Sequence, residues 1–210
     1  MRLLAIDTTG PGCAVALRRP GHADVFARET MARGQAERLA PMVEEVLARA
    51  GLAPRDLERI GVCTGPGSFA GSRIGVAFAR GLALATGAEC VGISRLAWTV
   101  ADAGIAGKAL AVHDARRGDV VVQAFDGGEA LAAPRTMAVE AVQTAIRDGR
   151  LTGALLGSGA RLIKCAATGV RDGEPELGAL LDLTGRATAP FGPPKPFYAR
   201  PPDANLPGGT

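Results

Sequence analysis

The order in which strands and helices are expected along the chain restricts its fold more than any other feature of the sequence. Short apolar runs bounded by Gly, Pro or Asp predict strands, and apolar residues that recur every three or four positions predict helices. In the front half this gives strands at 3–7, 13–17, 24–29, 59–63 and 89–93, and helices at 36–50, at 69–86 and from Ser94 through Trp98 and Val100. The chain therefore begins with three strands joined by tight turns and continues with helices and strands in alternation.

The back half begins the same order again. Strands are expected at 108–113, at 119–125 and, weakly, at 129–131, followed by a helix at 138–147, a strand at 154–157 and helices at 161–167 and 175–183. Two copies of three antiparallel strands followed by alternating helices and strands are what a duplicated RNase-H-like fold requires, the architecture of the actin, Hsp70 and sugar-kinase class. The sequence therefore predicts an α/β, actin-like fold with lobes at 1–103 and 104–190, the second one reduced, and a tail rich in proline and glycine at 191–210.

The glycine-rich stretch before the helix at 69–86 has two interpretations. Gly65-Pro66-Gly67-Ser68-Phe69-Ala70 fits the G-x-G-x-x-A form of the dinucleotide fingerprint. However, three preceding strands do not suit a Rossmann unit, and no lysine follows the glycines as a P-loop would need. The simpler interpretation is a tight turn in which Ser68 caps the helix, although free N–H groups at a helix start also attract anions. Gly65, Gly67 and Ser68 are therefore candidates for an anion site.

The helix at 69–86 is apolar almost all the way around, with Ser72, Arg73 and Arg80 confined to one narrow stripe. Such a helix is expected to be buried on nearly all sides. A ridge of small residues recurs every four positions, which lets a second helix approach closely; its members are Gly71, Gly75, Ala79 and Ala83. The ridge predicts either an interface with a partner subunit or an internal pairing with the helix at 36–50. Both interpretations apply if the helices at 36–50 and 69–86 together form half of a four-helix bundle.

Asp7 ends the first expected strand just before a Thr-Thr-Gly turn. In the actin and sugar-kinase class, an acid in that hairpin organises a metal ion and phosphate. Asp7, Thr8 and Thr9 are therefore candidates for nucleotide binding. The alternative is a turn-initiating aspartate that bonds to its own backbone.

The sequence disfavours several other functions. His22 and His113 are the only histidines and match no metal-ligand motif, so a zinc or iron site is not expected, and there is no G-x-S-x-G elbow for a serine hydrolase. No C-x-x-C pair occurs, and the cysteines are expected to be buried free thiols: Cys13, Cys63, Cys90 and Cys165.

The net charge of +3 is too small to indicate a nucleic-acid binder. No apolar run approaches the ~20 residues of a membrane helix, and the early acid disfavours a signal peptide, so a cytoplasmic protein is expected.

Five stretches of the sequence together resemble the TsaB (YeaZ) family. They are Leu4–Thr9, Glu37–Met42, Thr64–Gly75, Asp114–Asp119 and Tyr198–Ala204. The string GPGSF-x-G-x-RIG in the third stretch is specific to this family and its catalytic relative. The resemblance is strong as far as Phe125 and thin from 126 to 190. One departure is Gln35, where the family often has histidine.

The resemblance implies an accessory subunit for threonylcarbamoyladenosine synthesis on tRNA, without catalytic residues or metal ligands of its own. Such a subunit pairs with a TsaD-type subunit, which holds the metal and transfers the threonylcarbamoyl group, and a TsaE-type ATPase joins the pair. It implies contact with tRNA through the complex, a homodimer that uses similar surfaces, and ATP or ADP with Mg at the complex interface. In the family, helices that match 36–50 and 69–86 form the partner interface. The expected partner-binding residues are Leu39, Met42, Val46, Gly71, Gly75, Phe78 and Ala79.

Two rival functions remain open at the level of sequence. A small-molecule kinase or ATPase of the actin-like superfamily would use Asp7 and the glycine loop on ATP, with Gly157-Ser158-Gly159 as a faint second glycine motif. A glycoprotein peptidase would need metal ligands that the sequence does not offer.

Overall fold

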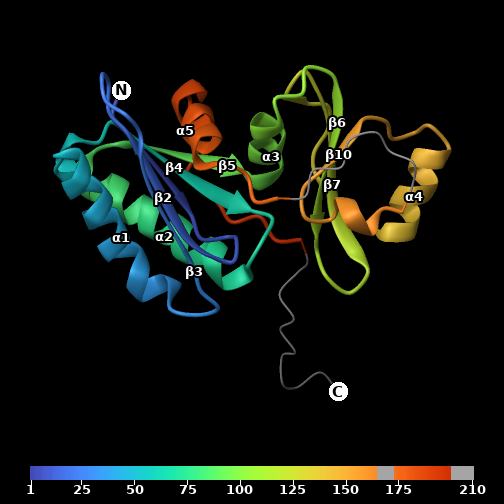
Figure 1. Cartoon of the computed structure of the whole chain (residues 1–210), viewed down its shortest axis with the longest axis horizontal. Coiled ribbons are helices and arrows are strands. Elements are labelled where there is room, and N and C mark those ends of the chain that lie inside the picture. Colours follow the sequence, from blue (N-terminus) through green and yellow to red (C-terminus); the bar gives the residue numbers. More distant parts are fainter. Residues whose placement is uncertain (165–172, 200–210) are drawn as a thin grey trace.

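The computed structural model describes residues 1–164 and 173–199 and divides them into two lobes, each built on one sheet (Figure 1). The first sheet has the order β3-β2-β1-β4-β5, formed by β1 (Leu3–Asp7), β2 (Gly12–Arg18), β3 (Val25–Thr30), β4 (Arg59–Gly65) and β5 (Glu89–Ser94). β1, β2 and β3 pair antiparallel, whereas β4 lies parallel to β1 and β5 parallel to β4. The five strands follow one another along the chain in the order that the front half of the sequence predicted.

The second sheet is a shortened version of the first. Its order is β10-β6-β7-β8, with β9 also paired to β7; the strands are β6 (Lys108–Asp114), β7 (Asp119–Asp126), β8 (Glu129–Ala130), β9 (Arg135–Ala138) and β10 (Ala154–Leu156). β6 and β7 are antiparallel and β10 is parallel to β6, as β4 is to β1 in the first sheet. The sequence did not predict β9, which pairs with the first half of β7. The fold is therefore the predicted actin-like pair of lobes with a reduced second lobe.

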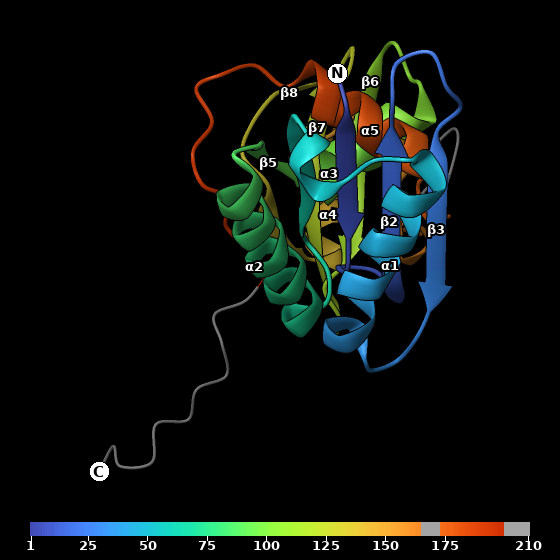
Figure 2. The ribbon, with the colours of Figure 1, turned by 90° about the vertical axis from the view of Figure 1, so that its left-hand side faces the viewer.

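Helices cover both faces of the first sheet. α1 (Gln35–Ala50) and α2 (Phe69–Thr86) lie side by side on one face, as Figure 2 shows, and α5 (Leu177–Arg186) covers the other. Apolar side chains of β1 alternate between these layers: Leu4 and Ile6 face α1 and α2, whereas Leu3 and Ala5 face α5. α4 (Val139–Arg147) packs on the second sheet through Val142.

α3 (Arg95–Ala103) joins the two lobes. Ser94 caps it by accepting a hydrogen bond from the Leu96 amide at 3.2 Å, as the sequence predicted. Trp98 is fully buried in the core beneath α5, whereas Leu96 and Val100 belong to the core of the second sheet. One helix therefore contributes side chains to both lobes.

The C-terminal part of the chain differs from its predicted assignment. The range 104–190 placed the last helix in the second lobe, but α5 packs on the first sheet, where Leu180 and Leu181 are fully buried. A short 3₁₀ turn, Ala160–Leu162, stands where a helix from 161 was expected. The rest of that helix, the Cys165 thiol and Arg200–Ala204 of the resemblance lie outside the described residues.

The described part of the tail, residues 191–199, contacts both lobes. The Phe197 amide donates to the Thr64 carbonyl oxygen at 2.8 Å, and the Thr136 hydroxyl of β9 donates to the Ala199 carbonyl oxygen at 2.8 Å. Tyr198 lies between these contacts and accepts a hydrogen bond from Arg73 of α2 at 2.9 Å. The tail is therefore extended, as predicted, and it links the lobes.

Candidate functional site

A cleft of about 450 Å³ lies between the lobes, at the carboxyl end of the first sheet. The residues of the first lobe that line it are Thr9, Gly10, Pro11, Gly67, Ser68 and Arg95. The second lobe contributes its own residues, and Glu174 and Ala199 complete the lining; those of the second lobe are His113, Asp114, Ala115, Arg116 and Ser158. In α/β sheets, ligands bind outside the carboxyl ends of the strands, so this cleft is the candidate ligand site of the fold.

Asp7 is fixed by a dense set of hydrogen bonds beside the cleft. Its Oδ1 accepts from the Thr9 amide at 2.8 Å and from the Thr9 hydroxyl at 2.6 Å. Its Oδ2 forms an ion pair with Arg95 Nη1 at 3.0 Å, and the same nitrogen donates to the Thr9 hydroxyl at 2.9 Å. The turn-initiating interpretation of Asp7 is thus confirmed by its bonds to Thr9, and its second oxygen binds a guanidinium.

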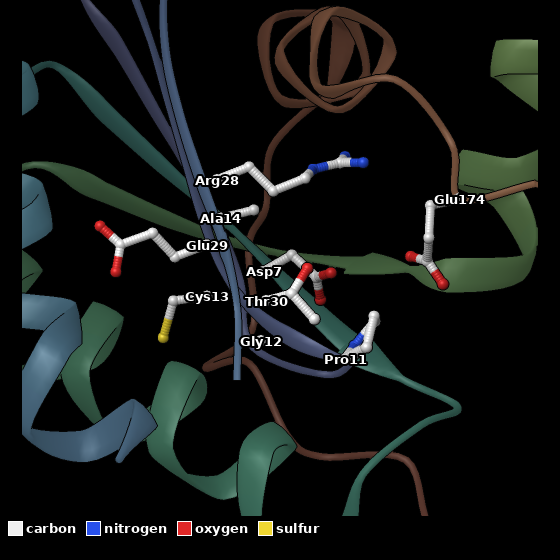
Figure 3. A pocket seen from close by; sticks show the side chains of 10 residues that line it. Asp7, Pro11, Gly12, Cys13, Ala14, Arg28, Glu29, Thr30 and Glu174 are labelled. Atoms are coloured by element: carbon white, nitrogen blue, oxygen red, sulfur yellow. The ribbon is translucent and has the colours of Figure 1, made fainter. Parts of the chain in front are cut away.

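Arg95 links Asp7 to Glu174. Its second nitrogen, Nη2, pairs with Glu174 Oε2. Both Asp7 and Arg95 side chains are only 6% exposed, whereas that of Glu174 is 40% exposed. Figure 3 shows Asp7 and Glu174 facing the same space on one side of β1 and β2, while Cys13 and Glu29 point to the other side. That space is a smaller cavity of about 140 Å³.

The ion pair controls the charge of these groups. Burial alone would raise the pKa of Asp7, but the guanidinium of Arg95 and the hydrogen bonds from Thr9 outweigh it and lower that pKa below its ordinary value. Burial likewise disfavours the Arg95 cation, yet Asp7 and Glu174 raise its pKa overall. Both groups are therefore charged at neutral pH.

Two uncharged groups stand next to this pair. Burial raises the pKa of the Cys63 thiol to about 12, and the nearby Asp7 charge adds to the effect. Burial and Arg95 lower the pKa of His113 to about 4, and its Nδ1 lies 3.1 Å from the Ser158 hydroxyl. The Cys63 thiolate and the His113 imidazolium are therefore both disfavoured at neutral pH.

The glycine loop packs against the hairpin between β1 and β2. The Ser68 amide donates to the Thr9 carbonyl oxygen at 2.8 Å, and the Ser68 hydroxyl caps α2 by accepting from the Gly71 amide at 3.1 Å. A Cβ on Gly67 would lie 2.4 Å from the Thr9 carbonyl oxygen. The glycine is thus needed for close approach of two backbone segments, and the capping interpretation is confirmed.

The six candidate nucleotide-binding residues come together only in part. Thr9, Gly67 and Ser68 line the cleft. Thr8 is fully buried and donates its hydroxyl to the Gly71 carbonyl oxygen at 2.6 Å, inside the contact with α2. Gly65 is buried beside the Phe197 carbonyl oxygen.

A Mg²⁺–nucleotide, which the fold class implies for this hairpin, does not fit the donor set. Mg²⁺ binds oxygen ligands and retains several waters. Both carboxylate oxygens of Asp7 are already engaged by Thr9 and Arg95, and the guanidinium presents a positive charge at the same point. Among residues 1–164 and 173–199, no group of three or more His, Cys, Asp or Glu is placed to hold a metal ion.

The glycines of the small-residue ridge on α2 face this chain's own sheet and the hairpin after β1, not a partner helix. A Cβ on Gly71 would lie 1.8 Å from the Thr8 carbonyl oxygen, and one on Gly75 would lie 2.5 Å from the Thr8 hydroxyl and 3.5 Å from Val62. Ala79 is fully buried in the same layer. The two glycines therefore accommodate Thr8 of the hairpin and Val62 of β4, whereas Ala79 and Ala83 belong to the core in which α1 also packs.

Most of the expected partner-binding residues lie inside the chain. Leu39 is 1% exposed, and Met42 and Val46 are fully buried in the core between α1 and the first sheet. With Gly71, Gly75 and Ala79 they cannot reach a partner, and Phe78 alone of the set is partly exposed. Leu39, Met42 and Val46 occupy the apolar stripe that any amphipathic helix turns to its own core.

The outer face of α2 is a different set of residues, which we call the α2 outer stripe. Its exposed members follow helical spacing: Ala70, Arg73, Ala77, Arg80, Gly81 and Leu84. Leu84 is 89% exposed. At the start of the helix, the Phe69 and Tyr198 rings lie 5.0 Å apart, and Arg73 stacks over Phe69 at 3.9 Å. The sequence placed Arg73 and Arg80 in one narrow polar stripe, but the partner contact was expected at the small-residue ridge instead of this face.

Sequence reasoning also missed Arg95, Glu174 and the His113–Ser158 pair. Arg95 begins an otherwise apolar helix, and Glu174 lies far along the chain in an irregular segment. The available signal was Asp7 itself, because a carboxylate buried at a strand end needs a charged or polar partner.

The two-lobed structure defines an actin-like protein. A solved structure of the ethanolamine utilization protein EutJ from Carboxydothermus hydrogenoformans shares this fold, with a TM-score of 0.52 at 12% identity, over 88% of this chain and 90% of that one. YeaZ from Pseudomonas aeruginosa is more similar, with a TM-score of 0.73 at 26% identity, over 88% of this chain and 90% of that one.

The family model described as "TsaD: tRNA N6-adenosine threonylcarbamoyltransferase" matches residues 27–170. The chain belongs to this family, and its similarities place it in the TsaB/YeaZ group of proteins of tRNA threonylcarbamoyladenosine biosynthesis. The TsaB protein of Escherichia coli (strain K12) is 38% identical over 126 residues, which are 57% of this chain and 53% of that protein. A tRNA N6-adenosine threonylcarbamoyltransferase of Paracoccus denitrificans is 47% identical over 78 residues, 36% of this chain and 22% of that protein. The chain thus spans about half the length of the TsaB relatives from Escherichia coli and Bacillus subtilis. No helix among the described residues is long and apolar enough to cross a membrane.

Proposed function

We propose that this chain is a noncatalytic accessory subunit that binds and stabilises a TsaD-type catalytic subunit during formation of threonylcarbamoyladenosine on tRNA. The relatives named above are biosynthesis proteins and transferases of this one modification. In this proposal the transfer chemistry, its metal ion, and ATP or ADP with Mg²⁺ belong to the partner side of the complex. A TsaE-type ATPase joins the pair, and tRNA is reached through the complex.

The observation that carries the proposal is the α2 outer stripe. Leu84 is among the most exposed large apolar side chains of the described residues, and Ala77 and Gly81 beside it leave the helix backbone accessible to a second helix. An exposed apolar strip bordered by charges is typical of a protein interface. Burial of Leu84 alone would contribute about 1.5–3 kcal/mol to association.

The charges around the stripe indicate how a partner is oriented. α2 presents Arg73 and Arg80 outward, whereas the neighbouring α1 presents Glu37 and Glu44. A partner, or a second copy of this chain, with the opposite arrangement would match both helices. Charge complementarity of this kind sets register and association rate more than affinity.

The buried centre supports a role without catalysis. Asp7 is saturated by Thr9 and Arg95, and neither Cys63 nor His113 carries a charge at neutral pH. At neutral pH Cys63 is therefore not a thiolate nucleophile, and His113, with its pKa lowered to about 4, is only a weak general base.

Co-purification of Leu84→Asp with a TsaD-type subunit from the same cells tests the proposal. Leu131→Asp is the matched control, because Leu131 is 60% exposed but lies in the second lobe. We expect Leu84→Asp to weaken association about 10- to 100-fold and to lower tRNA modification, with its melting temperature unchanged. Leu131→Asp should behave as the native chain. Equal association of both variants with the catalytic subunit would refute the proposed interface, and self-association in its place would show that the stripe serves a homodimer.

A further inference from the structure

The cluster of Asp7, Thr9, Arg95 and Glu174 has no role in the proposed interface, yet hydrogen bonds and ion pairs connect all four side chains. We propose that Arg95 is a built-in cation that stands in the place of a divalent metal ion at Asp7. It holds the hairpin after β1 in a ligand-bound arrangement and closes the site to metal and to metal-bound phosphate.

The hydrogen bonds of Asp7 support this assignment. A carboxylate that binds a hydrated metal ion leaves at least one oxygen directed at it. Here Oδ1 takes both donors of Thr9, and Oδ2 is directed at Arg95 Nη1. The guanidinium also donates a hydrogen bond to the Thr9 hydroxyl oxygen. Its neighbours are therefore oxygen atoms, the ligands that a hard cation prefers.

The position of the guanidinium supports it as well. Asp7 ends β1, Arg95 follows β5 directly, and Glu174 precedes α5, so the three charged groups meet at the carboxyl end of the first sheet. This is the end at which α/β sheets place ligands and their cations. Arg95 therefore occupies a ligand position, although it belongs to the chain.

The Arg95 guanidinium occupies the point at which the Asp7 and Glu174 carboxylates converge. A Cβ built on Gly10 would lie 3.2 Å from Glu174 Oε2, 3.3 Å from Arg95 Nη2 and 3.3 Å from Asp7 Oδ2. Three charged atoms thus converge on a point where even one carbon would be crowded. While Arg95 is in place, its positive charge opposes the binding of a Mg²⁺ ion at this point.

An ordinary structural ion pair would look similar, and the two roles differ in what happens when the arginine is removed. Loss of Arg95 leaves Asp7 buried and unpaired, which is strongly destabilising in either case. If the position is a cation position, a divalent metal ion restores the missing charge, because Asp7, Thr9 and Glu174 supply its oxygen ligands. If the arginine only fills space, metal has no effect.

The experiment compares the native chain, Arg95→Ala and the double variant Asp7→Asn/Arg95→Ala. Mn²⁺ binding is followed by electron paramagnetic resonance, and the melting temperature is measured with and without Mg²⁺. We expect no specific Mn²⁺ binding by the native chain, about one equivalent bound by Arg95→Ala with at least roughly tenfold higher affinity, and none by the double variant. Mg²⁺ should raise the melting temperature of Arg95→Ala by about 5 °C and leave the other two unchanged.

Each other result overturns the proposal. Specific binding of Mn²⁺ by the native chain would show that Arg95 does not close the site, and an equal response of both variants would show that Asp7 is not the ligand. If Arg95→Ala does not fold alone, refolding with Mn²⁺ replaces the melting measurement. Recovery of Arg95→Ala but not of the double variant is then expected, and failure of both refutes the idea. All arms use the isolated chain, so their outcome is independent of whether the α2 outer stripe binds a catalytic subunit.

Discussion

Replacement of Gly71 by alanine tests how α2 is held against the first sheet. The added Cβ would lie 1.8 Å from the Thr8 carbonyl oxygen and 3.0 Å from its carbonyl carbon. Because the obstacle is backbone, no rotamer change can relieve it, and the first turn of α2 has to move away from the hairpin. That movement also strains the buried hydrogen bond from the Thr8 hydroxyl to the Gly71 carbonyl oxygen, now 2.6 Å long.

The magnitude follows from three contributions. Overpacking of a core costs about 1–3 kcal/mol, and loss of a buried hydrogen bond costs about 1–3 kcal/mol more. Alanine is a better helix former than glycine and returns about 1 kcal/mol. The free energy of unfolding of Gly71→Ala should therefore fall by about 3 kcal/mol.

Gly81→Ala is the matched control, because Gly81 lies in the same helix and its Cβ would meet nothing within 4 Å. Only the propensity gain applies there, so the free energy of unfolding should rise by about 0.5–1 kcal/mol. Urea denaturation followed by far-UV circular dichroism and by the fluorescence of Trp98, the one tryptophan, measures both variants. The two variants are expected to change the free energy of unfolding in opposite directions. A Gly71→Ala variant as stable as the native chain would refute the contact between the ridge and β1.

Three further predictions concern protonation. The pKa of His113 is lowered from 6.5 to about 4, so its contribution to stability is present above pH 6.5 and is lost as the pH falls towards 4; urea midpoints of His113→Gln should lose less between pH 7 and 4.5, by on the order of 2 kcal/mol. The pKa of Asp7 is lowered from 3.8, so its contribution is present above pH 3.8 and is lost below it; Asp7→Asn should be less stable at pH 7, and urea midpoints should show a smaller further loss below pH 3.8. The pKa of Cys63 is raised to about 12 by burial and by Asp7, so a thiol reagent at pH 8 should modify the half-buried Cys90 before Cys63, and Cys63 only on unfolding, as peptide mass spectrometry would show.

The order of elements in the first lobe could be predicted because each element carries its own local signal. β1 to β5 and α1 to α3 begin and end close to the predicted positions. Gly51 ends α1 with a φ of 63°, the left-handed conformation that glycine adopts without strain. β9 escaped prediction because Arg135–Ala138 is mostly exposed and has no apolar run, so only its pairing with β7 makes it a strand.

The role of the ridge on α2 could not be predicted from its spacing. Small residues every four positions allow close approach of any neighbour, and the sequence does not say whether that neighbour is a helix or a sheet. The structure supplies Thr8, whose backbone and hydroxyl fill the notch at Gly71 and Gly75. The surface that this packing leaves exposed on α2 is the opposite stripe around Leu84, and average apolarity along the helix does not distinguish its residues from core residues.

The ion pair between Asp7 and Arg95 could not be predicted from local sequence patterns, because its two residues lie far apart in the chain. Asp7 could be selected from the sequence, but whether such a carboxylate binds a metal or a side chain depends on what lies within about 3 Å of its second oxygen. Arg95 is separated from it by 88 positions and is brought there by the register of β1, β4 and β5. With the hydroxyl of Thr9 alone as neighbour, Asp7 would be an incomplete ligand set that requires an external cation. With Arg95 the set is complete, so the same strand end that defines a ligand site in this fold class becomes a fixed internal joint between β1, α3 and the segment that leads to α5.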